Sequence, residues 1–280
     1  MSAAIDAIET RSVQANGLRF NVAVAGEGPV VVLLHGFPDT LRVWQRQIGA
    51  LAAAGYRVIA PDQRGCGDSD VPDGVGAYRL ETLADDIIAL LDALDVREPA
   101  HLVGHDWGAV VGWKLAIDHA ARFKSFVVMS VGHPAEYRRG FEQKWRAWYI
   151  YIFLIRGLAE RLLPARDWFA IRKLIDDSAE TDARIAALSR PGRLTAGLNW
   201  YRANVWQVLT RHYGTTSLPV FGMWSDGDFA LAESQMRNSQ RQVTGPWRYQ
   251  RIDNASHWLQ FDRADDINKL LLDWFEKPSA

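Results

Sequence analysis

The sequence predicts an α/β protein in which helices cover both faces of a mostly parallel sheet and one all-helical insertion interrupts the alternation. Short apolar runs, often β-branched, alternate with helical segments through the first half of the chain, which is typical of a parallel sheet. This alternation stops between residues 134 and 215 and then resumes. The 280 residues, 48% hydrophobic and 23% charged, can supply a large buried core.

The predicted elements outside the insertion follow one another at regular intervals. Apolar runs that end at glycine, proline or a helix start predict strands at residues 29–34, 57–60, 100–103, 125–131, 218–224 and 247–252. Helical spacing of apolar residues predicts helices at residues 41–54, 80–94, 107–119 and 265–275. In the second of these helices, Asp85 and Asp86 are expected on the polar face.

The insertion contains aromatic-rich helical segments broken at Gly157, Pro164 and Pro191, with no recognisable strand. It carries 14 Lys and Arg residues against 8 Asp and Glu, so it is net basic while the remainder of the chain is net acidic. We therefore predict a core made of residues 1–133 and 216–280, with residues 134–215 as a helical unit between them.

The overall composition argues against several kinds of partner. A formal net charge of −1 gives no reason to expect nucleic acid or an anionic membrane. The N-terminus lacks the apolar core of a signal peptide, and no apolar run approaches the roughly 20 residues that span a bilayer. A single cysteine, Cys66, excludes an internal disulfide. We expect a cytoplasmic protein with no nucleic-acid or membrane partner, no cofactor and no metal.

The segment AHLVGHDWGAVVGWKLA places an aspartate at a tight turn between a buried strand and a helix. Gly104, Asp106 and Gly108 form G-x-D-x-G, the pattern of a nucleophile elbow with aspartate where serine usually stands. In so tight a turn, side chains at the two glycine positions would collide with neighbouring backbone. Asp106 could instead serve only as a helix cap. The paired glycines and Trp107 favour the nucleophile.

A carboxylate nucleophile restricts the chemistry. Attack on a carbonyl would form an anhydride, whereas attack on a saturated carbon forms an alkyl ester that water can cleave. The substrate should therefore offer an electrophilic sp3 carbon with a leaving group, as epoxides and alkyl halides do. The 12 tryptophans fit either a large aromatic core or an apolar pocket lined with rings and N–H donors.

The elbow pattern predicts a later acid and a C-terminal histidine as partners of Asp106. Asp228 follows the strand at 218–224 and is preferred over Asp226, which spacing alone does not exclude. His257 follows the last strand, and we expect it to activate the water that hydrolyses the ester, with the acid orienting its ring.

Negative charge that develops on the nucleophile during hydrolysis requires hydrogen-bond donors. We expect backbone N–H groups of Phe37, in the HGFP turn, and of Trp107 to provide this oxyanion hole. The side chains of Trp107, Phe37 and Trp258 are expected to contact substrate.

Seven segments extend this pattern over the chain from about Gly17 to Phe275: HGFPDT, PDQRGCGDSD, GHDWGA, SVGHP, LNWYRAN, GDFAL and SHW. Together with the aspartate nucleophile, they resemble the epoxide hydrolases of the α/β-hydrolase superfamily. The resemblance implies an α/β-hydrolase fold, with a mostly parallel eight-stranded sheet flanked by helices and an all-α cap inserted after the sixth strand. Gln63 and Cys66 depart from the family's usual residues, and the sequence offers no functional account of either.

The resemblance also implies two cap tyrosines that hydrogen-bond the epoxide oxygen and protonate it as the ring opens. Tyr201 of LNWYRAN matches the second tyrosine. Tyr149 matches the first, with Tyr151 as a nearby competitor, and the local match is looser because Arg156 replaces a proline common in relatives.

The function implied is conversion of a small apolar epoxide and water to a vicinal diol, through an ester on Asp106 that water activated by His257 and Asp228 hydrolyses. A haloalkane dehalogenase is the alternative, although Phe37 replaces the polar residue that many dehalogenases carry there. A non-catalytic ligand-binding protein of the same fold is a remote alternative. The sequence leaves open whether the protein is a monomer or a homodimer.

Overall fold

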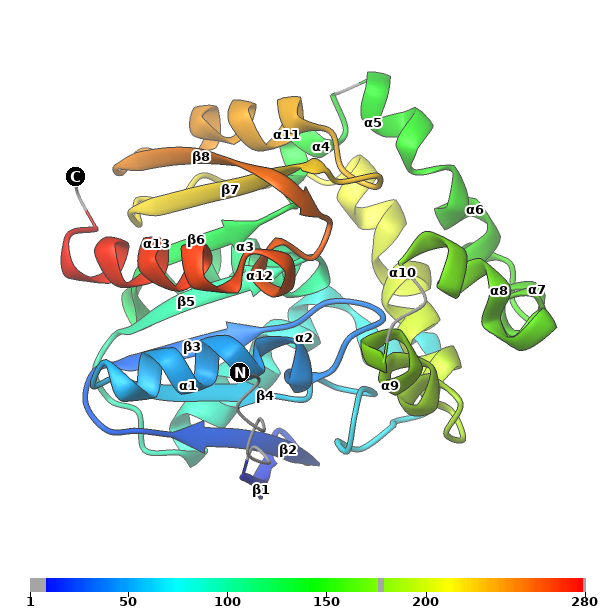
Figure 1. The fold of residues 1–280 in the computed structure, drawn as a ribbon, viewed down its shortest axis with the longest axis horizontal. Coiled ribbons are helices and arrows are strands. Elements are labelled where there is room, and N and C mark those ends of the chain that lie inside the picture. The colour runs from blue at the N-terminus through cyan, green and yellow to red at the C-terminus, as the bar shows by residue number, and fades with distance from the viewer. Residues whose placement is uncertain (1–8, 140, 176–178, 279–280) are drawn as a thin grey trace.

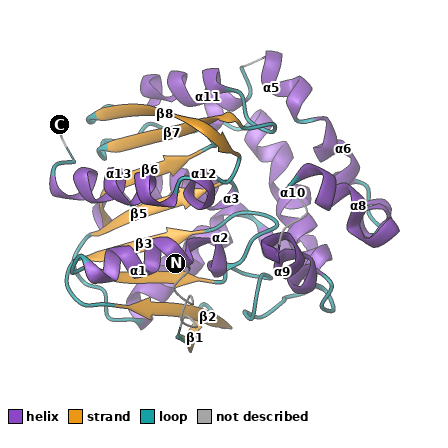
Figure 2. Cartoon of the chain, viewed as in Figure 1, coloured by secondary structure: helices purple, strands orange, loops and turns teal. Residues whose placement is uncertain are grey.

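One eight-stranded sheet forms the centre of the computed structural model, which describes residues 9–139, 141–175 and 179–278 (Figure 1). Helices cover both faces of this sheet, and a further group of helices lies beyond one end of the strands (Figure 2). The predicted fold class is confirmed: the sheet is mostly parallel, and the inserted helices follow its sixth strand.

The strands lie in the order β1-β2-β4-β3-β5-β6-β7-β8 across the sheet. They are β1 (Thr10–Ala15), β2 (Leu18–Ala25), β3 (Val30–Leu34), β4 (Arg57–Pro61), β5 (Ala100–His105), β6 (Phe123–Met129), β7 (Val220–Gly227) and β8 (Trp247–Ser256). β2 is antiparallel to both β1 and β4, and the other neighbours are parallel. β3 and β5 pair with Leu34 opposite Gly104, so the turns that follow these two strands meet at the same edge of the sheet.

The helices of the core divide between the two faces. On one face, α1 (Gln45–Ala53) packs against α13 (Ala264–Glu276). The apolar cluster of the other face includes residues of α2 (Leu80–Ala93), α3 (Trp107–Asp118) and α11 (Glu233–Asn238). Shorter elements are η1 (Leu41–Trp44), η2 (Val75–Tyr78), η3 (Ala120–Arg122), η4 (Ser239–Gln242) and α12 (Leu259–Asp262).

Between β6 and β7 the described residues form helices and no named strand. These helices are α4 (Pro134–Tyr137), α5 (Phe141–Arg146), α6 (Trp148–Leu154), α7 (Leu158–Leu162), α8 (Ala165–Leu174), α9 (Ala179–Leu188) and α10 (Arg193–Thr210). The long helix α10 packs against α6 and against η2 of the core, so it joins the insertion to the sheet. In the described part of the chain, no helix has both the length and the apolar character needed to cross a membrane.

The six strands predicted from apolar runs are present as β3 to β8, although several extend beyond the predicted bounds. The hairpin of β1 and β2 has no counterpart among the predicted elements. Asp86 also differs from expectation, because its side chain is buried rather than on the polar face of α2. It forms two hydrogen bonds with the buried Arg64, from Nε at 2.7 Å and Nη2 at 2.6 Å, and a third with Asn16 at 2.7 Å.

We expect Asp86→Ala to lower the free energy of unfolding by about 3–5 kcal/mol, because it leaves the Arg64 guanidinium buried without a counter-charge. Urea titration followed by circular dichroism measures this loss. Asp85→Ala is the matched control, since Asp85 is the exposed neighbour on the same helix, and it should change stability by no more than about 0.5 kcal/mol. Equal losses in the two variants would contradict the role given to the buried pair.

Candidate active site

Asp106 occupies the sharp turn between β5 and α3, with φ of 52° and ψ of −120°. A positive φ is unfavourable for a residue with a side chain, so the surroundings must impose it. The glycines on either side permit the turn: a Cβ on Gly104 would lie 2.5 Å from the Gly108 carbonyl oxygen, and a Cβ on Gly108 would overlap the Leu34 backbone. The geometry is that of the predicted elbow.

The Asp106 carboxylate makes no side-chain capping hydrogen bond to α3, so the cap-only alternative does not describe this residue. Its Oδ1 accepts a hydrogen bond from the backbone N–H of Phe37 at 2.8 Å. Gly36 makes this approach possible, because a Cβ there would overlap the carboxylate. The N–H of Trp107, also expected to serve the oxyanion, makes no hydrogen bond to the Asp106 carboxylate in the described structure.

Asp228 and His257 lie directly after β7 and β8 and form a buried pair. His257 Nδ1 is 2.9 Å from Asp228 Oδ2, while Asp228 Oδ1 accepts the N–H groups of Ala230 and Leu231, each at 2.9 Å. Asp226, the competing acid, is exposed and faces Arg251 at 3.7 Å. The structure therefore brings together the acid and the histidine that the sequence favours.

His257 lies between two carboxylates, since its Nδ1 faces Asp228 and its Nε2 faces Asp106 Oδ2 at 3.7 Å. Burial alone would lower the pKa of the imidazole, but Asp228 and Asp106 outweigh it and raise the pKa to about 10. Burial acts to raise the pKa of Asp228, and the charge and hydrogen bond of His257 with the two N–H groups hold it below its ordinary value. At neutral pH the free protein thus holds an imidazolium between carboxylates.

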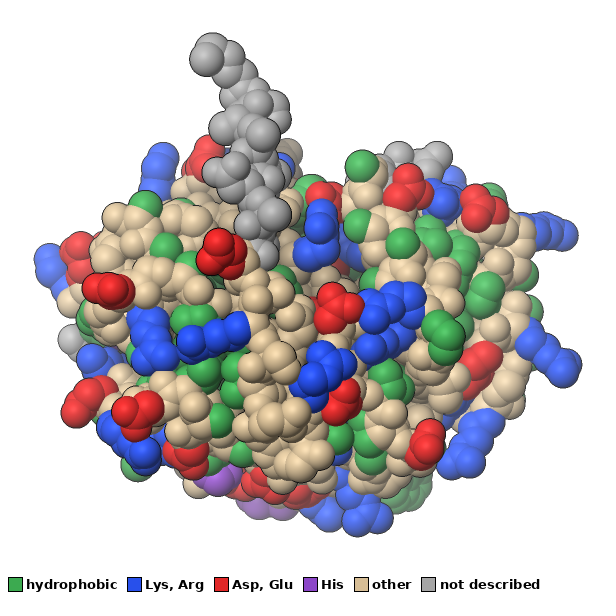
Figure 3. Space-filling view, turned by 90° about the horizontal axis from the view of Figure 1, so that it is seen from below, with side chains coloured by type: hydrophobic (Ala, Val, Ile, Leu, Met, Phe, Trp, Pro, Cys, Tyr) green, Lys and Arg blue, Asp and Glu red, His purple; other side chains and the backbone are tan. Residues whose placement is uncertain are grey.

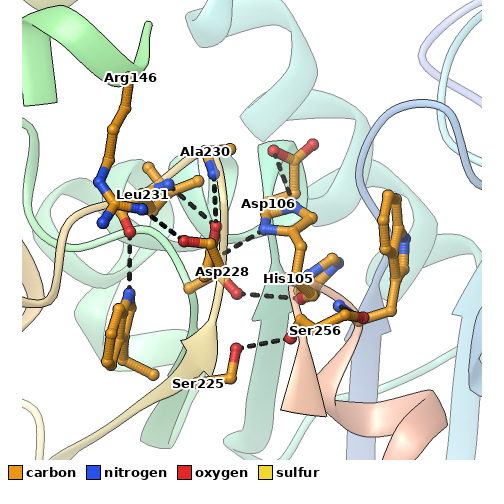
Figure 4. Close-up of polar contacts among 12 residues, drawn as sticks. His105, Asp106, Arg146, Ser225, Asp228, Ala230, Leu231 and Ser256 are labelled. Carbon is orange, nitrogen blue, oxygen red and sulfur yellow. Dashed lines mark hydrogen bonds and ion pairs between the residues drawn. The ribbon is translucent and has the colours of Figure 1, made fainter. Parts of the chain in front are cut away.

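Several further groups hold this pair in place. The carbonyl oxygen of His257 accepts a hydrogen bond from Ser130 Oγ at 3.2 Å and lies 2.8 Å from His105 Nε2. Arg146, from α5 of the insertion, donates through Nη1 to the carbonyl oxygen of Asp228 at 2.5 Å (Figure 4). The insertion is therefore hydrogen-bonded directly to the backbone that carries the acid, a contact that the sequence did not suggest.

A mostly apolar cavity of about 110 Å³ lies between the elbow and the insertion. Asp106, Trp107, Tyr149 and Tyr201 are among the residues that line it. Tyr201 is buried and packs edge-on against Trp107, with ring centroids 5.0 Å apart. Phe153 packs against both tyrosines, with its ring centroid 5.4 Å from that of Tyr149 and 5.1 Å from that of Tyr201. The nucleophile and both expected cap tyrosines thus share one cavity.

Tyr149 and Tyr201 are held in the protonated form. Burial, followed by the nearby Tyr137 hydroxyl and the charges of Asp106 and Asp228, raises the pKa of Tyr149 well above its ordinary value. Burial and Asp106 do the same for the pKa of Tyr201. Each phenol can therefore donate a hydrogen bond into the cavity at neutral pH. Tyr151 also lines the cavity but its side chain is 66% exposed, so its position suits the mouth rather than the interior.

Two of the expected substrate contacts are placed differently. Trp258 does not line this cavity: its indole N–H donates to the buried Asp39 at 2.8 Å, and the Arg184 guanidinium lies over its ring at 4.9 Å. Phe37 is also absent from the cavity lining and packs edge-on against Tyr201 at 5.7 Å. Neither of these side chains therefore lines this cavity, whereas Trp107 does.

Tyr137 and Gln143 are cavity residues that the sequence reading missed. Burial raises the pKa of Tyr137 to about 12, so the cavity holds a third protonated phenol. Gln143 donates to the Ala230 carbonyl oxygen at 3.0 Å and accepts from the Ala232 N–H at 2.9 Å, which fixes the loop after Asp228. The position of Tyr137 just beyond the SVGHP segment was the available signal.

Comparison with known proteins bears on this geometry. A profile of the α/β hydrolase fold matches residues 29–264. The chain belongs to the α/β-hydrolase family. This hydrolase is 34% identical, over 94% of its length, to Epoxide hydrolase A from Mycobacterium tuberculosis, of which 96% is covered. It is 33% identical, over 97% of its length, to the AB hydrolase superfamily protein YfhM of Bacillus subtilis, of which 99% is covered.

Among solved structures, an epoxide hydrolase from Vigna radiata matches the hydrolase with a TM-score of 0.86 at 29% identity, covering 98% of this chain and 100% of that one. Sequence and structure therefore give the same family. The predicted resemblance and the hydrolase class are confirmed.

The raised pKa of His257 predicts a pH dependence of stability in this hydrolase. Because folding raises the pKa from 6.5 to about 10, the stabilisation is complete below about pH 6.5 and is lost as pH rises toward 10. We expect Asp228→Asn to lower the free energy of unfolding most near pH 6. The difference from wild type should shrink toward pH 10, by at most about 1.4 kcal/mol per pH unit.

Urea titrations at pH 6, 8 and 10 measure this difference. Asp226→Asn, two residues away and exposed, is the control and should give a small difference that does not vary with pH. A pH-independent loss in Asp228→Asn would mean that this carboxylate does not set the charge of His257.

Proposed function

We propose that this protein hydrolyses a small apolar epoxide to a vicinal diol through a covalent ester on Asp106. The observation that carries the proposal is the shared cavity, which holds a carboxylate at a nucleophile elbow together with the protonated phenols of Tyr149 and Tyr201. Named epoxide hydrolases among its relatives support the same substrate class. In this proposal residues 134–215 form a cap that supplies the tyrosines, and residues 1–133 and 216–280 supply the other catalytic groups.

In the first step, Oδ2 of Asp106 attacks one ring carbon and forms a C–O ester bond. The Phe37 N–H holds Oδ1 at 2.8 Å, so Oδ2 is the oxygen free to attack. The C–O bond of the ring breaks at the attacked carbon, and its electron pair goes to the ring oxygen. Tyr149 and Tyr201 donate hydrogen bonds to that oxygen, and one of them gives it a proton, because an unprotonated alkoxide is a poor leaving group.

Ester formation changes the charge around His257. It removes the negative charge of Asp106, one of the two carboxylates that raise the pKa of the imidazole. The pKa therefore falls, the ring passes its proton, through water, to the tyrosinate that ring opening leaves behind, and the neutral imidazole becomes a base. Before the ester exists, the imidazolium cannot activate water, so hydrolysis follows alkylation.

In the second step, His257 takes a proton from water as the water oxygen adds to Cγ of Asp106. The N–H of Phe37 stabilises the charge that develops on Oδ1, and we assign the N–H of Trp107 to the same task. The Cγ–Oδ2 bond then breaks, and the diol leaves with Oδ2 of the enzyme and a proton from His257. The Asp106 carboxyl group, which now carries the oxygen of the water, returns its remaining proton to the imidazole. Asp228 orients the imidazole and stabilises its charged form throughout.

Halide displacement would use the same nucleophile, but a departing halide needs hydrogen-bond donors and no proton. The protonated phenols beside Asp106 therefore favour an epoxide. Turnover of an epoxide, a haloalkane and a p-nitrophenyl ester measured in parallel separates these reactions.

We expect His257→Gln to open an epoxide and then stop at the ester, since only the second step requires the base. Mixing this variant with a slowly turned-over epoxide should add one substrate mass to the protein, located by digestion in the peptide that contains Asp106. Asp106→Ala is the control and should form no adduct and show no turnover.

Oxygen labelling tests the same two steps in the wild type. A single turnover in heavy-oxygen water should give an unlabelled diol, because the oxygen added to carbon comes from Asp106. Labelled diol in the first turnover, together with no adduct in His257→Gln, would show that water attacks the epoxide directly.

We expect Tyr149→Phe and Tyr201→Phe each to slow ring opening by a factor that corresponds to about 2–4 kcal/mol, as for loss of one oxyanion donor. Single-turnover kinetics of ester formation measure the effect. Tyr151→Phe is the matched control on the same helix, because its exposed side chain lies at the mouth of the cavity. A silent Tyr149→Phe beside a severely impaired Tyr151→Phe would reverse the assignment of the first tyrosine.

A further inference from the structure

Large apolar side chains gather on the outer surface of the cap. Trp145, Trp148 and Trp206 are 72%, 62% and 75% exposed, which is unusual for tryptophan. We define the cap patch as these three residues and their exposed neighbours on the same helices and helix ends, Tyr151, Ile155 and Leu209.

The members of the cap patch lie on elements that pack together. α6 contacts both α5 and α10, so the exposed side chains of the three helices belong to one region of the surface. Within α10, Trp206 and Leu209 are three residues apart and therefore lie on one face of the helix. Figure 3, a view from below, shows hydrophobic, basic and acidic side chains interspersed at the right-hand, cap end of the molecule.

In the part of the chain that forms α5 to α7, the unpaired charges are cations. Between residues 141 and 162, both acids are engaged: Glu142 pairs with Arg146 at 2.9 Å, and Glu160 pairs with Arg202 at 2.7 Å. The three remaining charged side chains of this stretch are exposed and form no ion pair with a described acid. They are Lys144, Arg156 and Arg161. The stretch that carries Trp145 and Trp148 therefore has three unpaired cations and no unpaired acid among its described residues.

The cavity opens at the cap patch. Tyr151 and Leu209 line the cavity and are also 66% and 40% exposed, and the exposed Lys144 lines it as well. A molecule that enters between α6 and α10 passes these residues before it reaches Asp106. Whatever covers the cap patch therefore also covers this mouth.

We propose that the cap patch docks on the surface of an anionic lipid bilayer. Tryptophan and tyrosine rings favour the interface between water and lipid, and nearby Lys and Arg side chains are attracted to anionic head groups. A second copy of this chain is a poorer match, because a two-fold contact would bring the same three cations of each copy together. The inference reverses the expectation of no membrane partner. That expectation rested on the absence of a spanning segment and on a net charge of −1 that averages a basic cap with an acidic core.

Sedimentation of the full chain with vesicles tests the proposal without any substrate, so its outcome is separate from that of the proposed reaction. We expect binding to vesicles of phosphatidylcholine and phosphatidylglycerol mixed two to one, weakened by salt, and little binding to phosphatidylcholine alone. Changing Lys144, Arg156 and Arg161 together to Ala should weaken binding on the order of a hundredfold. Changing Lys124, Lys269 and Lys277 to Ala removes three exposed lysines of the core and should leave it unchanged.

The tryptophans provide the second arm. Trp145, Trp148 and Trp206 changed together to Ala should weaken binding by at least about tenfold, whereas the same three changed to Phe should retain most of it. Circular dichroism establishes that each variant is folded. The proposal would be overturned if the cap variant (Lys144, Arg156 and Arg161 to Ala) and the core variant (three lysines to Ala) lost vesicle binding equally. It would also be overturned if the wild type showed no preference for the anionic vesicles. The proposal would also be overturned if the wild type binds no vesicles and forms a dimer that the triple Trp-to-Ala variant dissociates. Analytical ultracentrifugation measures the dimer.

Discussion

Asp106 has a backbone conformation that residues with side chains avoid. The parallel pairing of β3 with β5 makes this conformation possible. The parallel register brings the turn after β3 alongside the elbow, where the Phe37 N–H reaches Oδ1. Gly36 and Gly108 leave the space that this approach requires. The position of the carboxylate is thus fixed by neighbouring backbone, and the cavity and the His257 pair are arranged around it.

The electrostatics of the site depend on that placement. Each carboxylate and the imidazole lose solvation when they are buried. Their mutual attraction opposes this cost, because the charges alternate from Asp228 through His257 to Asp106. The phenols on the opposite side of the cavity stay neutral because they are buried beside a carboxylate. Asp106 therefore acts with Asp228 to make the histidine cationic, and it adds to the effect of burial in keeping the tyrosines protonated.

Local sequence was sufficient to place Asp106, Asp228 and His257 at the ends of strands, because each immediately follows a buried strand of recognisable pattern. Asp86 was misplaced because helical spacing does not report a buried arginine that comes from another segment. The hydrogen bond of Trp258 was not predicted for the same reason, since its partner Asp39 lies 219 residues away. The β1–β2 hairpin was missed although its Asn16–Gly17 turn, with φ of 45° and 74°, is a known hairpin signal. The buried contacts of Asp86 and Trp258 join residues that are far apart in the chain, and the local spacing of residue types carries no information about such partners.

The two sides of the cavity differ in how far their residues can be substituted: the core side tolerates little change in side-chain size, and the apolar positions of the cap side tolerate more. On the core side, an added methyl group at Gly36 or Gly108 would collide with the nucleophile or its supporting backbone. On the cap side, the lining includes Ile150 and Val205, apolar side chains that pack without hydrogen bonds. Exchanges of size there can reshape the cavity while the nucleophile stays in place. We therefore expect substitutions that alter substrate preference, whether by natural drift or by laboratory selection, to fall mainly at the apolar cavity positions of α6 and α10.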